Sequence, residues 1–339
     1  MGRAGMFLKR IIFFTALCAG LAACSDHPKE PTPETPANPT PAKPVLAEAP
    51  AFNADSAYEF TKRQVDFGPR TLKSKAHENC AQYFIARLKA YGLKVQVQEG
   101  IVKNYEGKSF PFKNITGSFH PENNTRIAVF CHWDSRNIAD QDSIRKTEPI
   151  DGADDGASGC AVMLEIARDL QSKNPAVGVD VIFLDAEDTG QPEGTDAADH
   201  QEDTWCLGSQ YWSKHLPDNY APRLGILLDM VGAKGASFPM EGESMQYAPD
   251  LVRKVWGIAN DLGYSGFFTY KEDGFITDDH VYINRDAKIP TVDIINYDRE
   301  KGGFGFYHHR HSDNMNIIDK TTLQAVGQTV LQVIYSEVP

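Results

Sequence analysis

Short apolar segments alternate with helical segments along most of the chain, and this alternation limits the fold more than any other feature. Buried strands are predicted at 126–131, 179–184, 224–230 and 290–295. A helical spacing of apolar residues occurs at 74–91, 157–170, 208–215, 251–262 and 321–335. Strands separated by helices predict a single α/β domain with a mostly parallel central sheet and helices on both faces. A further strand is predicted at 93–99, where apolar residues alternate.

The N-terminal residues have a different composition and predict export. Residues 1–23 have the form of a signal peptide, because basic residues precede an apolar run at 11–21 that is too short to span a bilayer. The sequence LAAC at 21–24 resembles the bacterial lipobox, which implies cleavage before Cys24 and lipid attachment to its sulfur. A plain secretory signal followed by a chance cysteine is the alternative.

Residues 24–51 are rich in proline and predict an extended tether. The folded catalytic domain is then expected at 52–339, anchored by lipid at the bacterial cell envelope, on the periplasmic face or the cell surface. The formal charge of −12 and the lack of a long basic block after the leader exclude nucleic acid as an expected partner. A hydrophobic content of 41% excludes whole-chain disorder.

Acidic residues and histidines follow three of the predicted strands. His132 follows the first strand, Glu187 and Asp188 follow the second, and Asp229 ends the third. Two more clusters, GADDG at 152–156 and HHRHSD at 308–313, precede helices. Ligand sites in parallel sheets form beyond the carboxyl ends of the strands, and zinc takes imidazole and carboxylate ligands. The pattern therefore predicts a zinc site with two carboxylates and one late histidine as ligands.

Each cluster also has a simpler interpretation when it is taken singly. Asp154 or Asp155 could be the N-cap of the following helix. The acids at 187–188 could form a solvated turn, and the histidines at 308–311 could lie in a surface loop. Their joint occurrence at strand ends favours the metal site. The histidines outside these clusters, such as His77 and His200, are expected at the surface.

Seven motifs together resemble the zinc aminopeptidase-like family, and most closely its glutaminyl cyclase branch. They occur in the family's order as CHWDS (131–135), GADDGASGC (152–160), FLDAED (183–188), WCLGSQYW (205–212), LLDMVGA (227–233), TDDH (277–280) and HHRHSDNMNIID (308–319). The resemblance covers the chain from about residue 67 onward. It implies cyclisation of the N-terminal glutamine of peptides and proteins to pyroglutamate, with one zinc ion and release of ammonia.

The resemblance also implies roles for individual residues. It implies zinc ligation by Asp155, Asp188 and His309, acid–base catalysis by Glu187, a hydrogen-bonded pair of Asp229 and Asp278 beside the metal, and a disulfide between Cys131 and Cys160. The substrate pocket is expected to include Trp205, Asp293, Phe304, Phe306 and His308. The chain departs from the animal enzymes at three of these positions: Asp188 replaces a glutamate, His308 a tryptophan and Asp293 a histidine.

Two other functions remain open at this stage. In a di-zinc aminopeptidase, the metal ligands would be His132, Asp155, Asp188, Asp229 and His309, and Glu187 would activate a bridging water. The domain could instead be an inactive, lipid-anchored binding protein, although the intact Glu187 argues against a decayed site. The cysteine pair, TDDH and WCLGSQYW favour the cyclase over the peptidase.

Overall fold

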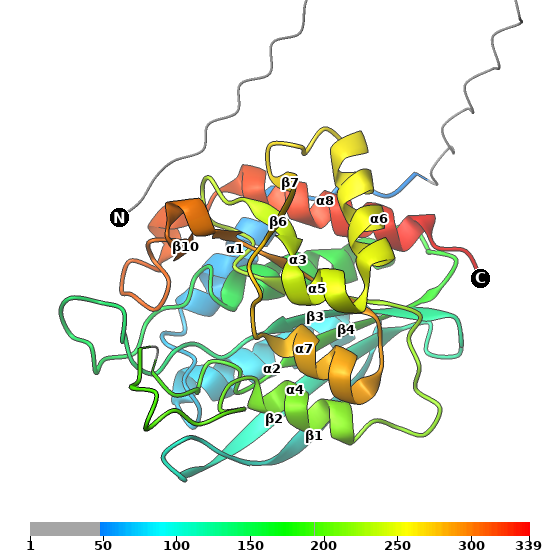
Figure 1. Ribbon diagram of the computed structural model, residues 1–339. Coiled ribbons are helices and arrows are strands. Elements are labelled where there is room, and N and C mark those ends of the chain that lie inside the picture. Colours follow the sequence, from blue (N-terminus) through cyan, green and yellow to red (C-terminus); the bar gives the residue numbers. More distant parts are fainter. Residues whose placement is uncertain (1–47, 193) are drawn as a thin grey trace, which may run out of the picture. The chain divides into compact units, whose positions relative to one another are not determined.

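A six-stranded sheet forms the centre of the computed structural model, which describes residues 48–192 and 194–339 (Figure 1). The strand order is β1-β2-β4-β3-β5-β8. The strands are β1 (Lys94–Lys103), β2 (Ser109–Phe119), β3 (Arg126–His132), β4 (Gly178–Leu184), β5 (Gly225–Asp229) and β8 (Thr291–Ile295). Strands β4, β3, β5 and β8 run parallel to one another, whereas β1 and β2 form an antiparallel edge. The predicted α/β fold with a mostly parallel sheet is confirmed.

Helices cover both faces of the sheet. One face packs against α1 (Ala54–Val65), α2 (Lys75–Ala90), α3 (Ala157–Leu170), α6 (Pro249–Asp261) and α8 (Lys320–Ser336). The other face packs against α4 (Leu207–Lys214) and the π-helix Ile283–Ala287, which continues α7 (Asp279–Tyr282). Successive residues of a strand point to opposite faces, so Val129 enters the larger core and Phe130 the smaller one.

Several elements were not predicted from the sequence. Besides α1, α7 and β2, they include β6 (Phe238–Glu241), α5 (Gly242–Tyr247), β7 (Phe268–Asp273), β9 (Tyr297–Asp298), β10 (Gly303–Phe304) and two short 3₁₀ helices, Arg299–Lys301 and Met315–Ile317. Strand β2 contains Pro111, Asn114 and Gly117, all of which are disfavoured in strands. Its pairing with both β1 and β4 outweighs this low propensity.

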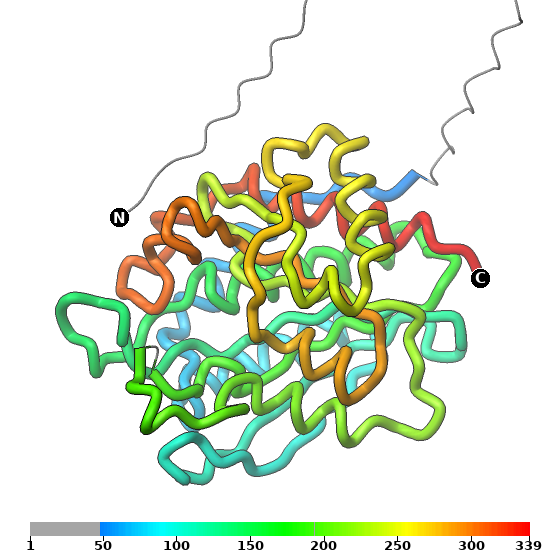
Figure 2. The backbone as a smooth tube through the Cα atoms, in the orientation of Figure 1, coloured from blue at the N-terminus to red at the C-terminus, as the bar shows by residue number. Residues whose placement is uncertain are grey.

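Long loops gather at the carboxyl ends of the parallel strands. Figure 2 shows the loops around residues 140, 195 and 305 on the same side of the backbone. These loops carry the acidic and histidine clusters that the sequence places after strands. The predicted signal peptide, Cys24 and the tether up to residue 47 lie outside the described residues. None of the helices in 48–192 and 194–339 is long and apolar enough to cross a membrane.

The four cysteines of the described segment are buried thiols. Cys131 Sγ and Cys160 Sγ lie 3.0 Å apart, whereas a disulfide bond requires about 2.0 Å. Cys160 Sγ donates a hydrogen bond to the His132 carbonyl oxygen at 3.1 Å. The disulfide expected from the family resemblance is therefore not formed in this structure, and the two thiols contact each other without a covalent bond.

His77 is buried and not at the surface, contrary to the expectation from sequence. Its side chain lies between helix α2 and the end of β4, where Nε2 is 2.9 Å from Asp185 Oδ1. Its ring also stacks on Trp133, with 4.1 Å between centroids. The buried Asp185 carboxylate requires a partner, and no pattern in the sequence predicts that His77 of α2 supplies it.

Asp169, near the end of α3, makes stability depend on pH. Burial and the nearby Glu165 raise its pKa to about 7, while unfolded aspartates titrate near 3.9. The folded state therefore binds more protons between about pH 4 and pH 7, and stability falls as pH rises through this window. We expect Asp169→Asn to stabilise the protein by about 2 kcal/mol at pH 8 and by little at pH 4.

Urea unfolding of both proteins at pH 4 and pH 8 tests this prediction. Asp218→Asn, at an exposed position, is the matched control and should show no pH-dependent difference. An equal change in the free energy of unfolding at the two pH values for Asp169→Asn would contradict the assignment.

Candidate active site

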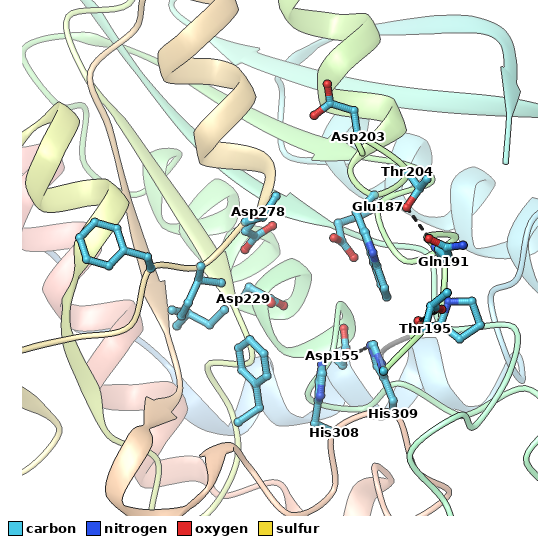
Figure 3. Close-up of a pocket in the computed structure, with 18 of the residues that line it drawn as sticks. Asp155, Glu187, Gln191, Thr195, Asp203, Thr204, Asp229, Asp278, His308 and His309 are labelled. Carbon is cyan, nitrogen blue, oxygen red and sulfur yellow. Dashed lines mark hydrogen bonds and ion pairs between the residues drawn. The ribbon is translucent and has the colours of Figure 1, made fainter. Parts of the chain in front are cut away.

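A cavity of about 590 Å³ opens among the loops at the carboxyl edge of the sheet (Figure 3). Its wall includes the acids Asp155, Glu187, Asp229 and Asp278, the histidines His308 and His309, and the aromatic residues Trp205 and Phe304. In Figure 3, Asp229 and Asp278 lie opposite Gln191 and Thr195, and Glu187 lies between them. The acid clusters of four separate segments thus meet at one place.

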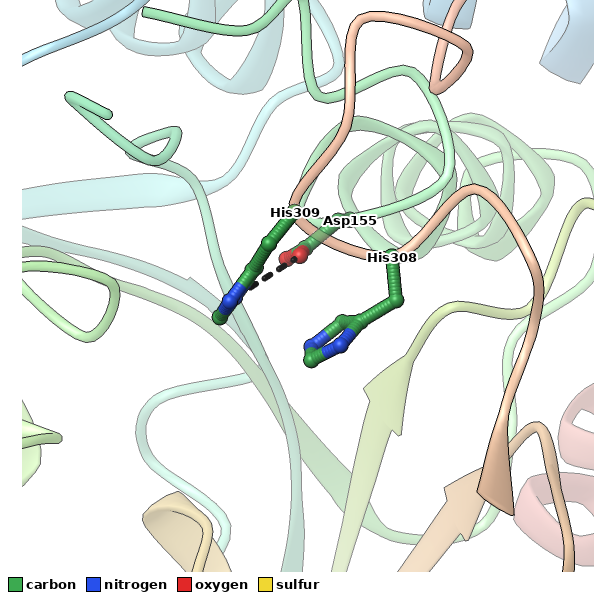
Figure 4. A group of neighbouring side chains, drawn as sticks. All are labelled: Asp155, His308 and His309. Carbon is green, nitrogen blue, oxygen red and sulfur yellow. Dashed lines mark ion pairs between the residues drawn. The ribbon is translucent and has the colours of Figure 1, made fainter. Parts of the chain in front are cut away.

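The three predicted metal ligands lie close together, because the carboxylates of Asp155 and Asp188 both approach the same ring nitrogen of His309. His309 Nε2 lies 3.2 Å from Asp188 Oδ1. It also lies 3.7 Å from Asp155 Oδ2, and Figure 4 draws this ion pair as a dashed line. Asp188 is fully buried, and neither of its carboxylate oxygens accepts a hydrogen bond from any described residue. A buried carboxylate with unsatisfied oxygens requires a cation or a proton. Two carboxylates and one imidazole, with room on the cavity side, fit a catalytic zinc ion.

The candidate second-metal ligands also lie together. His132 Nε2 is 3.0 Å from Asp155 Oδ1 and 3.0 Å from Asp229 Oδ1. One ligand atom from each of these three residues lies within 4.8 Å of the others. The alternative that Asp154 or Asp155 caps the next helix is wrong, because Gly156 is the N-cap of α3 and no side chain bonds to that helix end.

Two further aspartates, which have no role in the predictions from sequence, bind the backbone of the predicted metal ligands. Asp134 accepts hydrogen bonds from the backbone N–H groups of Glu187 and Asp188, at 3.0 and 3.2 Å. Asp313 accepts from the N–H groups of Asp154 and Asp155, at 2.7 and 3.1 Å. Asp134 lies in the motif CHWDS and Asp313 in the motif HHRHSDNMNIID. Their positions in these motifs are the only indication in the sequence that they belong to the site.

A buried arginine fixes the position of Trp205. Arg136 Nη1 donates to the carbonyl oxygens of Asp188 and Gly190, at 3.1 and 2.9 Å. Its guanidinium lies 4.4 Å from the centre of the Trp205 ring. Trp205 in turn stacks on His309, with 5.6 Å between centroids and 5° between planes. Arg136 therefore connects the Asp188 loop to the imidazole ligand.

Backbone strain occurs at three positions of the site. Ala186, Met230 and His309 adopt φ values of 58°, 48° and 52°, a left-handed region that residues other than glycine rarely occupy. Ala186 precedes Glu187, and Met230 follows Asp229. Such strain persists only where surrounding contacts enforce it, and here it turns three functional side chains toward the cavity.

The electrostatics separate the acids into two groups. Burial alone would raise the pKa of Asp155, but the hydrogen bond and charge of His132 and the charge of His309 hold that pKa below its usual range. Burial raises the pKa of Asp229 to about 8 and the pKa of Asp278 above its ordinary value. Burial, together with Asp188 and Asp278, also holds the pKa of Glu187 well above that of an ordinary glutamate. The cavity therefore combines one acid whose ionised form is favoured with acids whose affinity for a proton is raised.

Two of the five predicted pocket residues are not part of the cavity wall. Trp205, Phe304 and His308 line the cavity, and the His308 ring stacks on His309 at 3.7 Å. Phe306 is 75% exposed and lies outside the wall. Asp293 is fully buried in the middle of β8 and not at its carboxyl end, so it cannot reach the cavity. It lies beneath Asp278, with an oxygen 3.7 Å from His280 Nδ1.

The chain is similar to a known peptidase family and to solved structures of bacterial proteins. Residues 114–334 match Peptidase family M28. The glutaminyl cyclase of Tannerella forsythia has 50% sequence identity and a TM-score of 0.82, covering 85% of this chain and all of that one. A Zn-dependent exopeptidase from Parabacteroides distasonis has 49% identity and a TM-score of 0.82, covering 86% of this chain and all of the other.

A curated relative is more distant in sequence. The glutaminyl-peptide cyclotransferase of Bos taurus is 26% identical over 267 residues, and the match covers 67% of this chain and 66% of the bovine protein. The segment that matches the family contains the three predicted zinc ligands, Glu187, and the aspartates Asp134 and Asp313. The chain is a member of peptidase family M28.

Proposed function

We propose that the protein is a zinc-dependent glutaminyl-peptide cyclotransferase, which converts the N-terminal glutamine of peptides and proteins to pyroglutamate. The observation that carries this proposal is a set of three acids beside the convergent side chains of the proposed metal triad, Asp155, Asp188 and His309. The three acids are the half-buried Glu187 and the buried Asp229 and Asp278. The similarity to solved bacterial glutaminyl cyclases supports it.

One zinc ion would be held by Asp155, Asp188 and His309, and when bound it would polarise the γ-carbonyl of the substrate glutamine. In the reaction, the α-amine nitrogen forms a bond to Cδ, the carbon of the side-chain amide. The bond between Cδ and the amide nitrogen breaks, and that nitrogen leaves as ammonia. Glu187 takes the proton from the attacking amine and returns it to the leaving nitrogen. Its raised pKa suits both directions of this transfer, because one carboxyl must accept and then donate the same proton.

Asp229 and Asp278 would orient the substrate. Their carboxyl groups lie on the cavity wall opposite Gln191 (Figure 3), where they can accept hydrogen bonds from the α-amino group. Orientation of this kind contributes strongly to an intramolecular cyclisation, since nucleophile and carbonyl belong to the same residue. The Asp229–Asp278 hydrogen bond that the family resemblance implies is not formed. Asp229 Oδ1 instead lies 3.0 Å from His132 Nε2, and Asp278 Oδ2 has no hydrogen-bond partner among the described residues.

A di-zinc aminopeptidase is the second candidate, and the cluster of His132, Asp155 and Asp229 is the observation that favours it. In the cyclase, His132 and Asp229 bond to each other, as their 3.0 Å separation allows. In the peptidase, the same two side chains would instead bind a second ion. The proposal also includes export and lipid attachment at Cys24, supported by the leader and lipobox sequences.

Mass analysis of peptide products separates the two candidates. We expect the purified protein to convert Gln-initiated peptides to products that are lighter by one ammonia, and to leave Leu-initiated peptides intact. We expect about one zinc ion per chain by elemental analysis. Release of free N-terminal residues, together with two zinc ions per chain, would contradict the cyclase proposal and support the peptidase.

A further inference from the structure

Resting on the proposed cyclase function, we propose that the cavity selects peptides with lysine or arginine directly after the N-terminal glutamine, and that Glu202 recognises the positive charge. The cavity volume of about 590 Å³ falls within the roughly 300–1,000 Å³ of pockets that hold drug-sized ligands. It therefore has room for more than the one residue that reacts.

The charges of the cavity wall are unbalanced. Among the described residues that line it, none is lysine or arginine. Four of its six acids, Asp155, Glu187, Asp229 and Asp278, belong to the reacting centre. The other two, Glu202 and Asp203, lie on the loop between Asp188 and Trp205. This loop is therefore the part of the wall that can distinguish charges on the second residue of a peptide.

Of these two loop acids, only Glu202 keeps an uncompensated charge. Asp203 Oδ1 accepts a hydrogen bond from the Tyr282 hydroxyl at 2.9 Å and lies 3.7 Å from Arg285 Nη1. In Figure 3 its carboxyl group points away from Asp155 and His309. Glu202 is exposed and forms no ion pair with any residue in the described part of the chain. An incoming cationic side chain would supply a partner of opposite charge that the described residues do not provide.

The loop is held in place by its own hydrogen bonds. The buried Gln191 donates through Nε2 to the Asp199 carbonyl oxygen at 2.8 Å, and its Oε1 accepts from the Gln201 N–H at 2.8 Å. The Gln191 N–H donates to the Thr204 hydroxyl at 3.1 Å, which closes the base of the loop (Figure 3). Glu202 is thus presented on an ordered wall, which lowers the entropy cost of binding.

Aromatic residues supply the apolar part of the same cavity wall. Phe275, Tyr297 and Phe304 line the cavity, and Phe275 is 71% exposed. The methylene stems of lysine and arginine pack on such rings while the charged end stays near solvent and an acid. Glutamate at the same position would bring a like charge toward Glu202 and the acids of the centre.

Competing peptides that differ only in the second residue test the inference. The peptides Gln-Lys, Gln-Arg, Gln-Ala and Gln-Glu, each followed by the same neutral sequence, are assayed at pH 8 and low salt, where an ordinary imidazole is neutral. We expect kcat/KM to be roughly five- to tenfold higher for the basic peptides than for Gln-Glu, mainly through KM. The ratio should decrease in 0.5 M NaCl, because the contact is exposed.

Substitution at position 202 separates this contact from the general acidity of the site. We expect Glu202→Gln to reduce the ratio between basic and acidic peptides severalfold, and Glu202→Lys to reverse it. Glu59→Gln on α1 changes the net charge equally at an exposed position outside the cavity wall, and should leave the ratio unchanged. Equal kcat/KM values for the four peptides, or an unchanged ratio in Glu202→Gln, would overturn the inference. Failure to cyclise any of them, including Gln-Ala, would overturn the cyclase proposal and this inference with it.

Discussion

Replacing Glu187 by glutamine is expected to lower kcat for Gln-initiated peptides by about 10²- to 10⁴-fold, the usual contribution of a positioned acid–base group. Glutamine has the same shape, and its carbonyl oxygen can still accept the hydrogen bond that Cys206 Sγ donates to Glu187 Oε1 at 3.2 Å. The backbone contact of residue 187 with Asp134 is also retained. The substitution therefore removes proton transfer while preserving the local structure.

Three measurements check this prediction: kcat, zinc content and the temperature of unfolding. Zinc content should remain that of the unsubstituted protein, because Glu187 is not in the metal triad. Glu106→Gln, at an exposed glutamate in the β1–β2 turn, serves as the control and should keep full activity. Full cyclisation by a zinc-loaded Glu187→Gln protein would refute the assignment of the catalytic base.

Replacing His309 by alanine is expected to abolish zinc retention and cyclisation together. His309 Nε2 is the atom on which the two carboxylates converge, and alanine leaves those acids without the third ligand. The binding of a metal only to the folded state stabilises a protein by about 2.7 kcal/mol at 100 times its Kd. Added zinc should therefore raise the unfolding temperature of the original protein much more than that of His309→Ala.

His311→Ala is the matched control, because it removes an imidazole two residues away on the same loop. His311 Nδ1 lies 2.7 Å from Asp142 Oδ2, so this side chain connects two loops and does not join the metal triad. We expect His311→Ala to keep its zinc and most of its activity. Loss of zinc from His311→Ala but not from His309→Ala would show that the ligand had been chosen wrongly.

The carboxylates of the site form two groups, one that faces the proposed metal position and one that supports the backbone behind it. Asp155 and Asp188 face the metal position, whereas Asp134 and Asp313 accept hydrogen bonds from the backbone that carries those ligands. The inner acids are thereby placed by rigid peptide groups and not only by their own rotamers. Supporting contacts of this kind commonly affect metal affinity by 10- to 100-fold. This arrangement also explains why a domain of this size buries so many acids on one edge of its sheet.

Much of the fold could be predicted from sequence, because burial in regular elements follows a local pattern. Helix α3 occupies 157–170, as its apolar spacing predicts, and β3 and β8 differ from their predicted bounds by one residue. Strand β2 escaped prediction, since its stability comes from two neighbouring strands and not from its own residues. The acids at the strand ends could be identified in the sequence because they directly follow apolar runs.

The sequence by itself determined the alternation of helices with the parallel strands, the placement of acids and histidines at one edge, and the residue types that suit a zinc ion. Only the tertiary structure decided which distant groups meet. It brought Asp313 to the Asp154–Asp155 backbone across 159 positions, buried His77 against Asp185, and left Phe306 outside the cavity. The spacing of apolar residues is a local property, so each segment reveals its own helix or strand. Contacts between distant residues depend instead on how the loops close, and no single segment specifies that.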